Sequence, residues 1–220
     1  MLASVIADPK TNVPRLVSEP DDPLRHALLF CGISLAITFA AQAPLLADGQ
    51  DFTATAGALL MVKLFEVLLF NAILVMIFKL IGGTGTFEQT LTASLYISSP
   101  VYLFVIFAQI IGVGLLAGGD PQIALSWRYG VLDYASPQWA TFATTYPTEA
   151  YGLTILAPIT FSVVIAWFIY CWSIYRELHN LTRWRSLLAY LLAFVLFLGV
   201  GYLRVLVVRG LGAGAALGIN

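Results

Sequence analysis

The sequence predicts an all-α membrane protein: a polytopic helix bundle with five transmembrane helices and two short interfacial helices in an outer loop. The 220-residue chain is 60% hydrophobic and only 10% charged, whereas a soluble domain carries roughly 25% charged residues. Its mean hydropathy is +0.87. The apolar residues form long continuous runs that do not alternate with polar ones, which favours spanning helices and excludes a barrel. A net charge of −1 excludes general attraction to nucleic acid.

Residues 1–26 are predicted to form a polar cytoplasmic leader. Its prolines, at positions 9, 14, 20 and 23, are too frequent for a continuous helix. A five-helix transmembrane domain is expected over residues 27–209, followed by a Gly/Ala-rich outer tail over 210–220. Each span needs roughly 20 apolar residues. The runs that qualify lie at about 27–46, 54–81, 91–117, 150–175 and 186–208.

Basic residues in the flanking loops predict the orientation. Cytoplasmic loops carry an excess of Lys and Arg, and five spans put seven such residues on the N-terminal side against two or three on the other. We therefore expect a cytoplasmic N-terminus and a periplasmic C-terminus in a bacterial cytoplasmic (inner) membrane. The seven are Lys10, Arg15, Arg25, Lys79, Arg176, Arg183 and Arg185; the others are Arg128 and Arg209, with Arg204 just inside the fifth span.

A glycine-rich segment, residues 82–90, joins the second and third spans. It is not a phosphate-binding loop, because no Lys directly precedes a Ser or Thr at the helix start and no strand comes before it. The glycines are expected to allow a sharp turn. Thr86 and Gln89 form a capping-box pattern for the third span, and Glu88 lies in its first turn, where the helix dipole favours an acid.

The outer loop, 118–149, is predicted to hold two short helices. Asp120-Pro121 and Ser136-Pro137 are both N-cap and first-turn signals. The density of aromatic residues suits either helices lying in the headgroup layer or an ordered cap on the bundle. We take Trp127, Trp139 and Phe142 as a possible contact surface, because Trp139 and Phe142 share one helix face and that face is expected to be buried in lipid or against another subunit.

Four polar residues are predicted to lie within the membrane: Lys63, Glu66 and Asn71 in the second span and Arg204 in the fifth. Buried charge in a membrane helix carries a cost of roughly 2.5–3.5 kcal/mol per residue on insertion scales. Lys63 and Glu66 are spaced to pair on one face, and Arg204 lies at a similar depth. The cluster is interpreted either as a neutral pair that fixes helix packing or as an ion, proton or headgroup site.

A stripe of small residues, Gly32, Ala36 and Ala40, runs along the first span. It permits close helix approach, either inside the bundle, which is the commoner case, or towards another copy. Cys31 and Cys171 lie in apolar runs and are interpreted as small hydrophobes. His26 and His179 lack the partner spacing of a metal site, and no Gly-x-Ser-x-Gly occurs. We therefore expect no catalytic, cofactor-binding or metal-binding residues and no enzyme activity.

The most distinctive motif runs from the second span into the third. Gly-Gly-x-Gly-[Ser/Thr]-[Phe/Trp] followed by Tyr-x-x-x-Pro resembles the prokaryotic branch of the Yip family of small membrane proteins. The resemblance covers about residues 1–117 and implies five spans with a cytoplasmic N-terminus. The residues that carry it are Gly82, Gly83, Gly85, Thr86 and Phe87, then Tyr96 and Pro100.

The resemblance to the Yip family also bears on partners. Its eukaryotic members resemble trafficking adaptors that bind Rab-type GTPases, and their leader carries Asp-Leu-Tyr-Gly-Pro. This chain has Asp21-Asp-Pro-Leu-Arg25 instead, so we do not expect GTPase binding. We expect a membrane-organising, scaffold or accessory subunit that contacts membrane lipids and other membrane-protein subunits or further copies of itself. The alternative is a small transporter or channel built on Lys63, Glu66 and Asn71.

Overall fold

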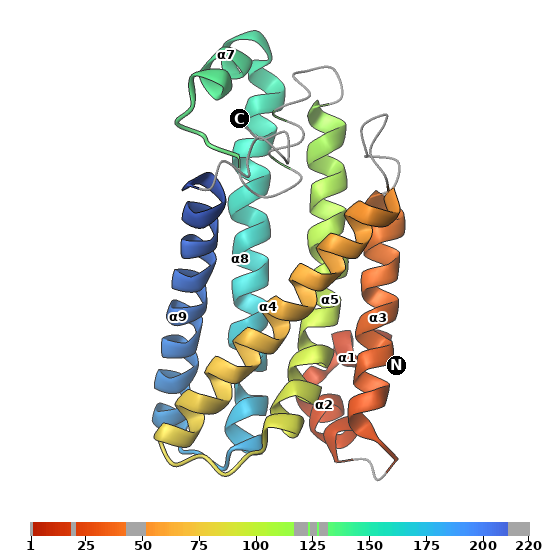
Figure 1. The fold of residues 1–220 in the computed structure, drawn as a ribbon, viewed down its shortest axis with the longest axis vertical. Coiled ribbons are helices and arrows are strands. Elements are labelled where there is room, and N and C mark those ends of the chain that lie inside the picture. The colour runs from red at the N-terminus through yellow and green to blue at the C-terminus, as the bar shows by residue number, and fades with distance from the viewer. Residues whose placement is uncertain are drawn as a thin grey trace. The chain divides into compact units, whose positions relative to one another are not determined.

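The computed structural model describes residues 2–18, 21–42, 52–116, 123, 127 and 132–210, and these form eight α-helices and no strand (Figure 1). The all-α class is therefore confirmed for the described residues. The helix start predicted at Asp120-Pro121 and residues 211–220 of the tail lie outside them. The helices are α1 (Leu2–Ala7), α2 (Pro9–Val17), α3 (Pro23–Gln42), α4 (Phe52–Leu80), α5 (Phe87–Leu116), α7 (Pro137–Thr145), α8 (Pro147–Leu178) and α9 (Arg183–Gly210).

Two of the described helices, α5 and α8, are long and apolar enough to cross a membrane. Shorter apolar stretches lie at Pro23–Thr38 and Val67–Leu80. The structure therefore supports a helical membrane protein, and the count of five spans remains a prediction.

The chain divides into two compact units, which are described separately. The first contains Met1–Leu103 and Ala166–Tyr202, and the second contains Phe104–Ile165 and Leu203–Asn220. Each has its own cluster of buried apolar side chains among the described residues.

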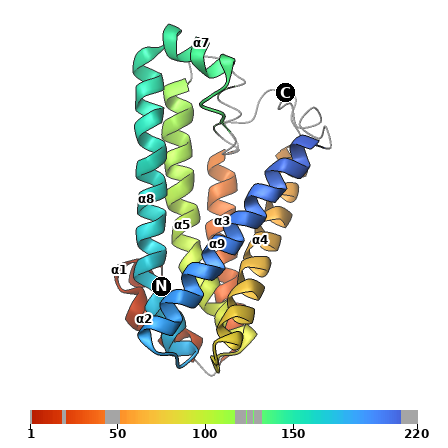
Figure 2. The ribbon, with the colours of Figure 1, turned by 90° about the vertical axis from the view of Figure 1, so that its left-hand side faces the viewer.

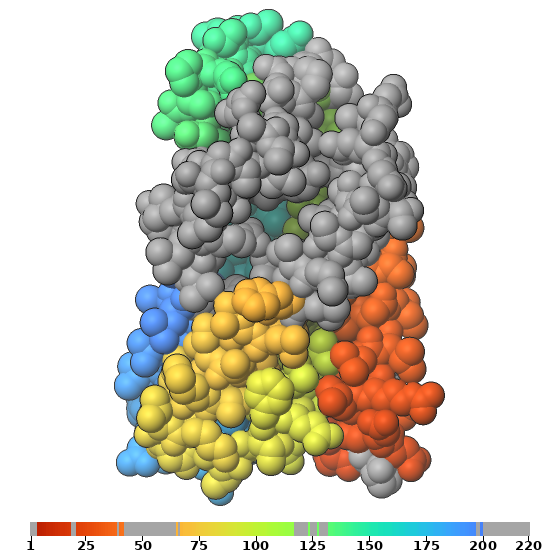
Figure 3. All heavy atoms as spheres, viewed as in Figure 1, coloured from red at the N-terminus to blue at the C-terminus, as the bar shows by residue number. Residues whose placement is uncertain are grey.

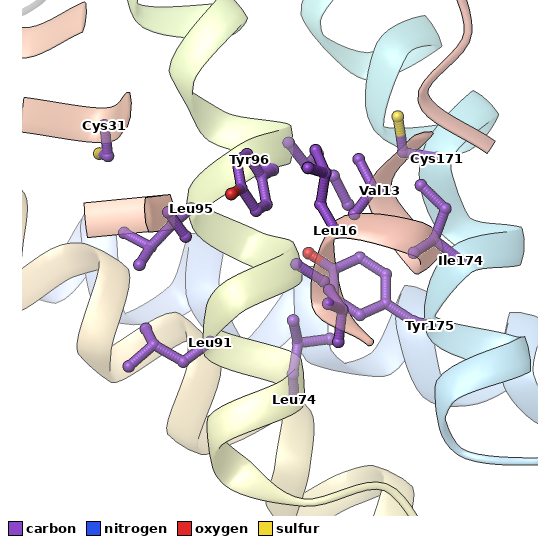
Figure 4. Packing of buried hydrophobic residues seen from close by; sticks show 14 of the residues in the cluster. Val13, Leu16, Cys31, Leu74, Leu91, Leu95, Tyr96, Cys171, Ile174 and Tyr175 are labelled. Atoms are coloured by element: carbon purple, nitrogen blue, oxygen red, sulfur yellow. The ribbon is translucent and has the colours of Figure 1, made fainter. Parts of the chain in front are cut away.

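The core of the first unit draws side chains from α1 to α5, α8 and α9 (Figure 4). Tyr96 of α5 lies at its centre, fully buried, with its ring 5.4 Å from that of Phe30. Leu74 of α4 and Tyr175 of α8 are also fully buried. Tyr96 is one of the family-motif residues, so this position of the motif serves packing.

The N-terminal leader, residues 1–26, contributes apolar side chains to the core. Its helices α1 and α2 bury Val5, Val13, Leu16 and Val17 in the first unit's core, and the expectation of a wholly polar segment is corrected on this point. The apolar residues recur on one face of α2, while its other face stays exposed. As predicted, no continuous helix forms: the chain breaks at Asp8.

Local signals explain where α2 begins. Asp8 caps the helix by accepting a hydrogen bond from the Thr11 amide at 3.2 Å. Hydrogen bonding with the Thr11 side chain first, and with the Thr11 amide second, lowers the pKa of the Asp8 carboxyl. Pro9 follows at the first helical position, where a missing N–H does no harm. Lys10 then places its ammonium 3.9 Å from the centre of the Tyr170 ring, a cation–π contact that ties α2 to α8.

The second unit is organised around α7. Ser136 caps this helix by accepting a hydrogen bond from the Trp139 amide at 3.1 Å, so the predicted start signal is confirmed. The rings of Trp139 and Phe142 pack 5.5 Å apart. They are only 9% and 3% exposed, because they lie against Leu153 and other apolar residues of the chain itself.

Trp127, the third residue of the possible contact surface, also packs inside the second unit. Its indole lies on Gly112 of α5, where any Cβ would overlap the ring. Its Nε1 is buried, and it has no hydrogen-bond partner within the part of the chain that the structure describes. The three residues thus contribute to the packing of their own unit.

The small-residue stripe of α3 is not buried. Gly32, Ala36 and Ala40 are all exposed, and a Cβ placed on Gly32 would meet nothing within 4 Å. The commoner interpretation, packing inside the bundle, is therefore not seen among the described residues.

Candidate functional site

The α4–α5 turn and the α8–α9 turn meet at the same end of the first unit (Figures 1 and 2). Thr84 of the first turn donates its backbone N–H to the carbonyl of His179 in the second, at 3.0 Å. The two segments lie about 95 positions apart in the chain. Figure 3 shows the last turns of α4 beside the first turns of α5 on the molecular surface.

Both helices that lead into these turns end in the same way. At the end of α4, Gly82 adopts φ +94° and the Gly83 amide donates to Phe78 O at 2.8 Å. At the end of α8, Asn180 adopts φ +50° and the Leu181 amide donates to Arg176 O at 3.1 Å. These are Schellman motifs with a left-handed residue, which favours Gly and then Asn. The predicted sharp turn at the glycines is confirmed.

The start of α5 is a capping box. Thr86 N donates to Gln89 Oε1 at 3.1 Å, and Gln89 N donates to Thr86 Oγ1 at 3.2 Å. Glu88 lies in the first turn, as predicted. These two bonds satisfy amides that α5 cannot pair internally, so they hold the turn in register with the helix.

His179 is the centre of the site. It is fully buried, and its ring stacks on Phe78 with the centroids 4.4 Å apart. Its Nε2 lies 3.0 Å from the Thr90 hydroxyl. That hydroxyl also lies 2.7 Å from Thr86 O, an oxygen that can only accept, and this arrangement favours the Nε2–H tautomer of His179.

The other ring nitrogen, Nδ1, is then an acceptor. It has no hydrogen-bond partner among the described residues, and the backbone at Gly83 and Gly85 presses against it. Burial, together with the positive charge of Lys79, lowers the pKa of His179 from 6.5 to about 4. The imidazole is consequently neutral at physiological pH.

A second group of polar side chains lies one turn deeper. Ser94 Oγ is 2.8 Å from Thr90 O, 3.1 Å from Asn71 Oδ1 and 3.1 Å from the Tyr175 hydroxyl. The Ser94 and Tyr175 hydroxyls share a hydrogen bond in which either can be the donor. Asn71 also donates from Nδ2 to Phe87 O at 3.3 Å. The side chains thus link α4, α5 and α8.

We call these residues the turn network. Most of its bonds join one helix or turn to another, and buried polar networks of this kind help to specify a unique packing. Its members are Asn71, Thr84, Thr90, Ser94, Tyr175 and His179.

The turn network contains one residue of the predicted intramembrane cluster, Asn71. Its amide is engaged at both ends. The structure does not describe the side chains of Lys63, Glu66 and Arg204, so the predicted pairing of Lys63 with Glu66 stays a prediction. Within the described residues no group of three or more His, Cys, Asp or Glu side chains is arranged to hold a metal ion.

Most of the turn network was missed from the sequence. Thr90 and Ser94 are four residues apart in α5, and Tyr175 and His179 are four apart at the end of α8. Such i,i+4 pairs lie on one helix face, and polar pairs of this kind inside apolar helices could have pointed to the network.

The family-motif residues gather at the same place. Gly82 forms the turn, Gly83 and Gly85 admit His179, Thr86 caps α5, and the carbonyl of Phe87 accepts from Asn71. Further along α5, Pro100 lacks an amide proton and weakens the helix hydrogen bonding there. The Trp167 indole of α8 donates to the nearby carbonyl of Ile97 at 2.9 Å.

Comparison with known families decides the relationship. The Yip1 domain model matches residues 3–206, nearly the whole chain. The chain belongs to the Yip1 family. This confirms the resemblance to the Yip family, without deciding the branch, and identifies the chain as a membrane protein of a family that is not known for enzymes.

A curated relative agrees with this assignment. The Yip1-family chain is 30% identical over 118 residues to Protein YIPF6 of Danio rerio, a match that covers 50% of this chain and 47% of the relative. The chain thus spans about half the length of the curated relative it matches. No solved structure matches it significantly.

Proposed function

We propose that this Yip1-family protein is a five-span scaffold or accessory subunit of a bacterial cytoplasmic membrane that acts through protein and lipid contacts. One observation carries the proposal: the turn network directs its polar groups inward, while the long helices present large apolar side chains outward. Exposed examples include Ile33 on α3, Phe107 on α5 and Leu192 on α9. Extensive apolar faces mark contact with lipid or with partner proteins.

The proposal is supported over the transporter alternative by the state of Asn71. A transport site needs polar groups that can bind a solute, whereas the Asn71 amide bonds to Phe87 O and Ser94. It therefore serves helix packing.

The scaffold proposal predicts a stable partner. Purified from its native membrane in mild detergent, the chain is expected to retain another membrane protein, or a further copy of itself, at a fixed ratio. Ala36→Phe on the exposed stripe of α3 is expected to lower that ratio several-fold, because a bulky ring prevents close helix approach. Ala140→Phe, the same change at an exposed position of α7, is the matched control. A chain that purifies alone and conducts solutes in vesicles would contradict the proposal.

The proposed topology predicts where reporters lie. With five spans and seven basic residues on the N-terminal side, a fusion at Asn180 is expected to report cytoplasm and a fusion at Asn220 is expected to report the periplasm. Paired alkaline phosphatase and fluorescent-protein fusions measure this directly. The reverse pattern would refute the orientation, and the same signal at both sites would refute the span count.

A further inference from the structure

The first unit contains a half-open cavity of about 140 Å³ between four helices. Its walls include Val67 and Phe70 of α4, Ser98 and Val101 of α5, Phe168 of α8 and Phe194 of α9. The lining is almost entirely apolar. For comparison, an engineered apolar cavity of about 150 Å³ stays dry and takes up benzene, so this space is large enough for a ring or several carbons of a chain.

The depth of the cavity decides what can reach it. At 1.5 Å per residue, the lining residues lie about 10 to 23 Å along their helices from the ends at the turn network, most of them about 15 to 20 Å. The hydrocarbon core of a bilayer is about 30 Å thick. With the ends at the turn network placed at one face of the bilayer, as the proposed topology has them, the cavity lies near the middle of the membrane, where hydrocarbon chains surround the protein.

We infer that this cavity holds several carbons of one acyl chain of a membrane phospholipid. The inference rests on the proposed membrane-embedded function and deepens its lipid contacts. Water is a poor occupant because it needs two to four polar partners, and the surface of the cavity is almost entirely apolar although Ser94, Ser98 and Tyr102 contribute to its lining. An acyl chain fills an apolar space without unpaired polar groups.

The position of Ser94 links this site to the turn network. Ser94 lines the cavity and also bonds to Asn71 and Tyr175. A chain seated in the cavity packs against the same turn of α5 that holds these bonds, so it stabilises the packing of α4, α5 and α8 at this level.

The test measures phospholipid retained by the purified full-length chain. Protein reconstituted in dioleoyl phosphatidylcholine vesicles is extracted, washed exhaustively in lipid-free detergent, and analysed by mass spectrometry of bound lipid. Wild type is expected to retain a single phospholipid. Val101→Phe fills the cavity and is expected to abolish retention, whereas Val195→Phe, the same change on an exposed face of α9, is expected to leave it unchanged.

A second measurement guards against misfolding of the filled variant. Wild type in vesicles that contain a phospholipid with a photoreactive group at mid-chain is expected to crosslink at Phe70 and Phe168 more strongly than at Phe65, which is exposed on α4. Labelling in proportion to exposure would overturn the inference. So would equal retention by both variants, no retention by wild type, or retention of a prenyl lipid instead. Because no partner protein is present, these results are independent of the copurification test.

Discussion

Gly85→Ala is expected to destabilise the first unit by about 3 kcal/mol, among the largest effects of any single methyl group in this protein. A Cβ at this position would lie 2.8 Å from Leu178 O and 2.9 Å from His179 Nδ1. One neighbour is backbone and the other is a ring held by stacking on Phe78, so neither moves away easily. Gly83→Ala meets the same obstacle, with Phe78 O at 2.8 Å.

Two other glycines supply graded controls for this prediction. Gly32→Ala places its methyl group in open space on a helix and is expected to be neutral or to stabilise by about 0.5–1 kcal/mol. Gly82→Ala also has room, but φ +94° strains an L side chain, so an intermediate loss of about 1 kcal/mol is expected. Thermal unfolding in mild detergent ranks the four variants. If Gly85→Ala melts like Gly32→Ala, the close approach to His179 is wrong.

Acidification is expected to weaken the same end of the protein. The pKa of His179 falls from 6.5 to about 4 on folding, because of burial first and the charge of Lys79 second. Between these values the unfolded chain binds a proton that the folded chain does not, so folding stability rises with pH. The contribution is complete above pH 6.5 and is lost progressively as the pH falls to 4, by about 3 kcal/mol in all.

The control for this pH dependence is His179→Gln, which keeps a donor near Thr90 but does not titrate. Unfolding of wild type and variant is compared in detergent at pH 7.5, 5.5 and 4.5, values chosen to bracket the titration. The difference between them is expected to shrink as the pH falls, because only wild type must lose a proton to fold. Parallel curves would show that His179 is not buried in the neutral form.

The turn network is where sequence and structure diverge most clearly. The capping box at Thr86 and Gln89 was predictable from four consecutive residues, because its bonds form within one helical turn. The Ser136 cap of α7 was predictable for the same reason. The bond between Thr90 and His179 joins residues 89 positions apart, and no local pattern states which helix end meets which turn.

The burial of individual helix faces likewise depended on contacts between distant parts of the chain, which the sequence did not show. The aromatic residues of α7 were visible in the sequence, but the surface that they would meet was not. The buried face of α2 was missed, because the leader was expected to be polar. The structure places Val13 and Leu16 in the first unit's core and Trp139 in the second. The apolar character of a side chain predicts that it is removed from water. Whether it then contacts lipid, another subunit or its own chain depends on the packing of distant elements.

The sequence alone determined that this protein is helical, apolar enough for a membrane and a member of the Yip1 family, since composition, run length and the glycine motif are properties of short segments. Only the tertiary structure decided why Gly83 and Gly85 leave no room for a side chain and why His179 is neutral. Both follow from two turns, far apart in the chain, that approach until a Cβ at Gly83 or Gly85 would lie within 3.0 Å of the imidazole. Such a distance arises from helix packing, which acts across the whole first unit and leaves no signature in any one segment.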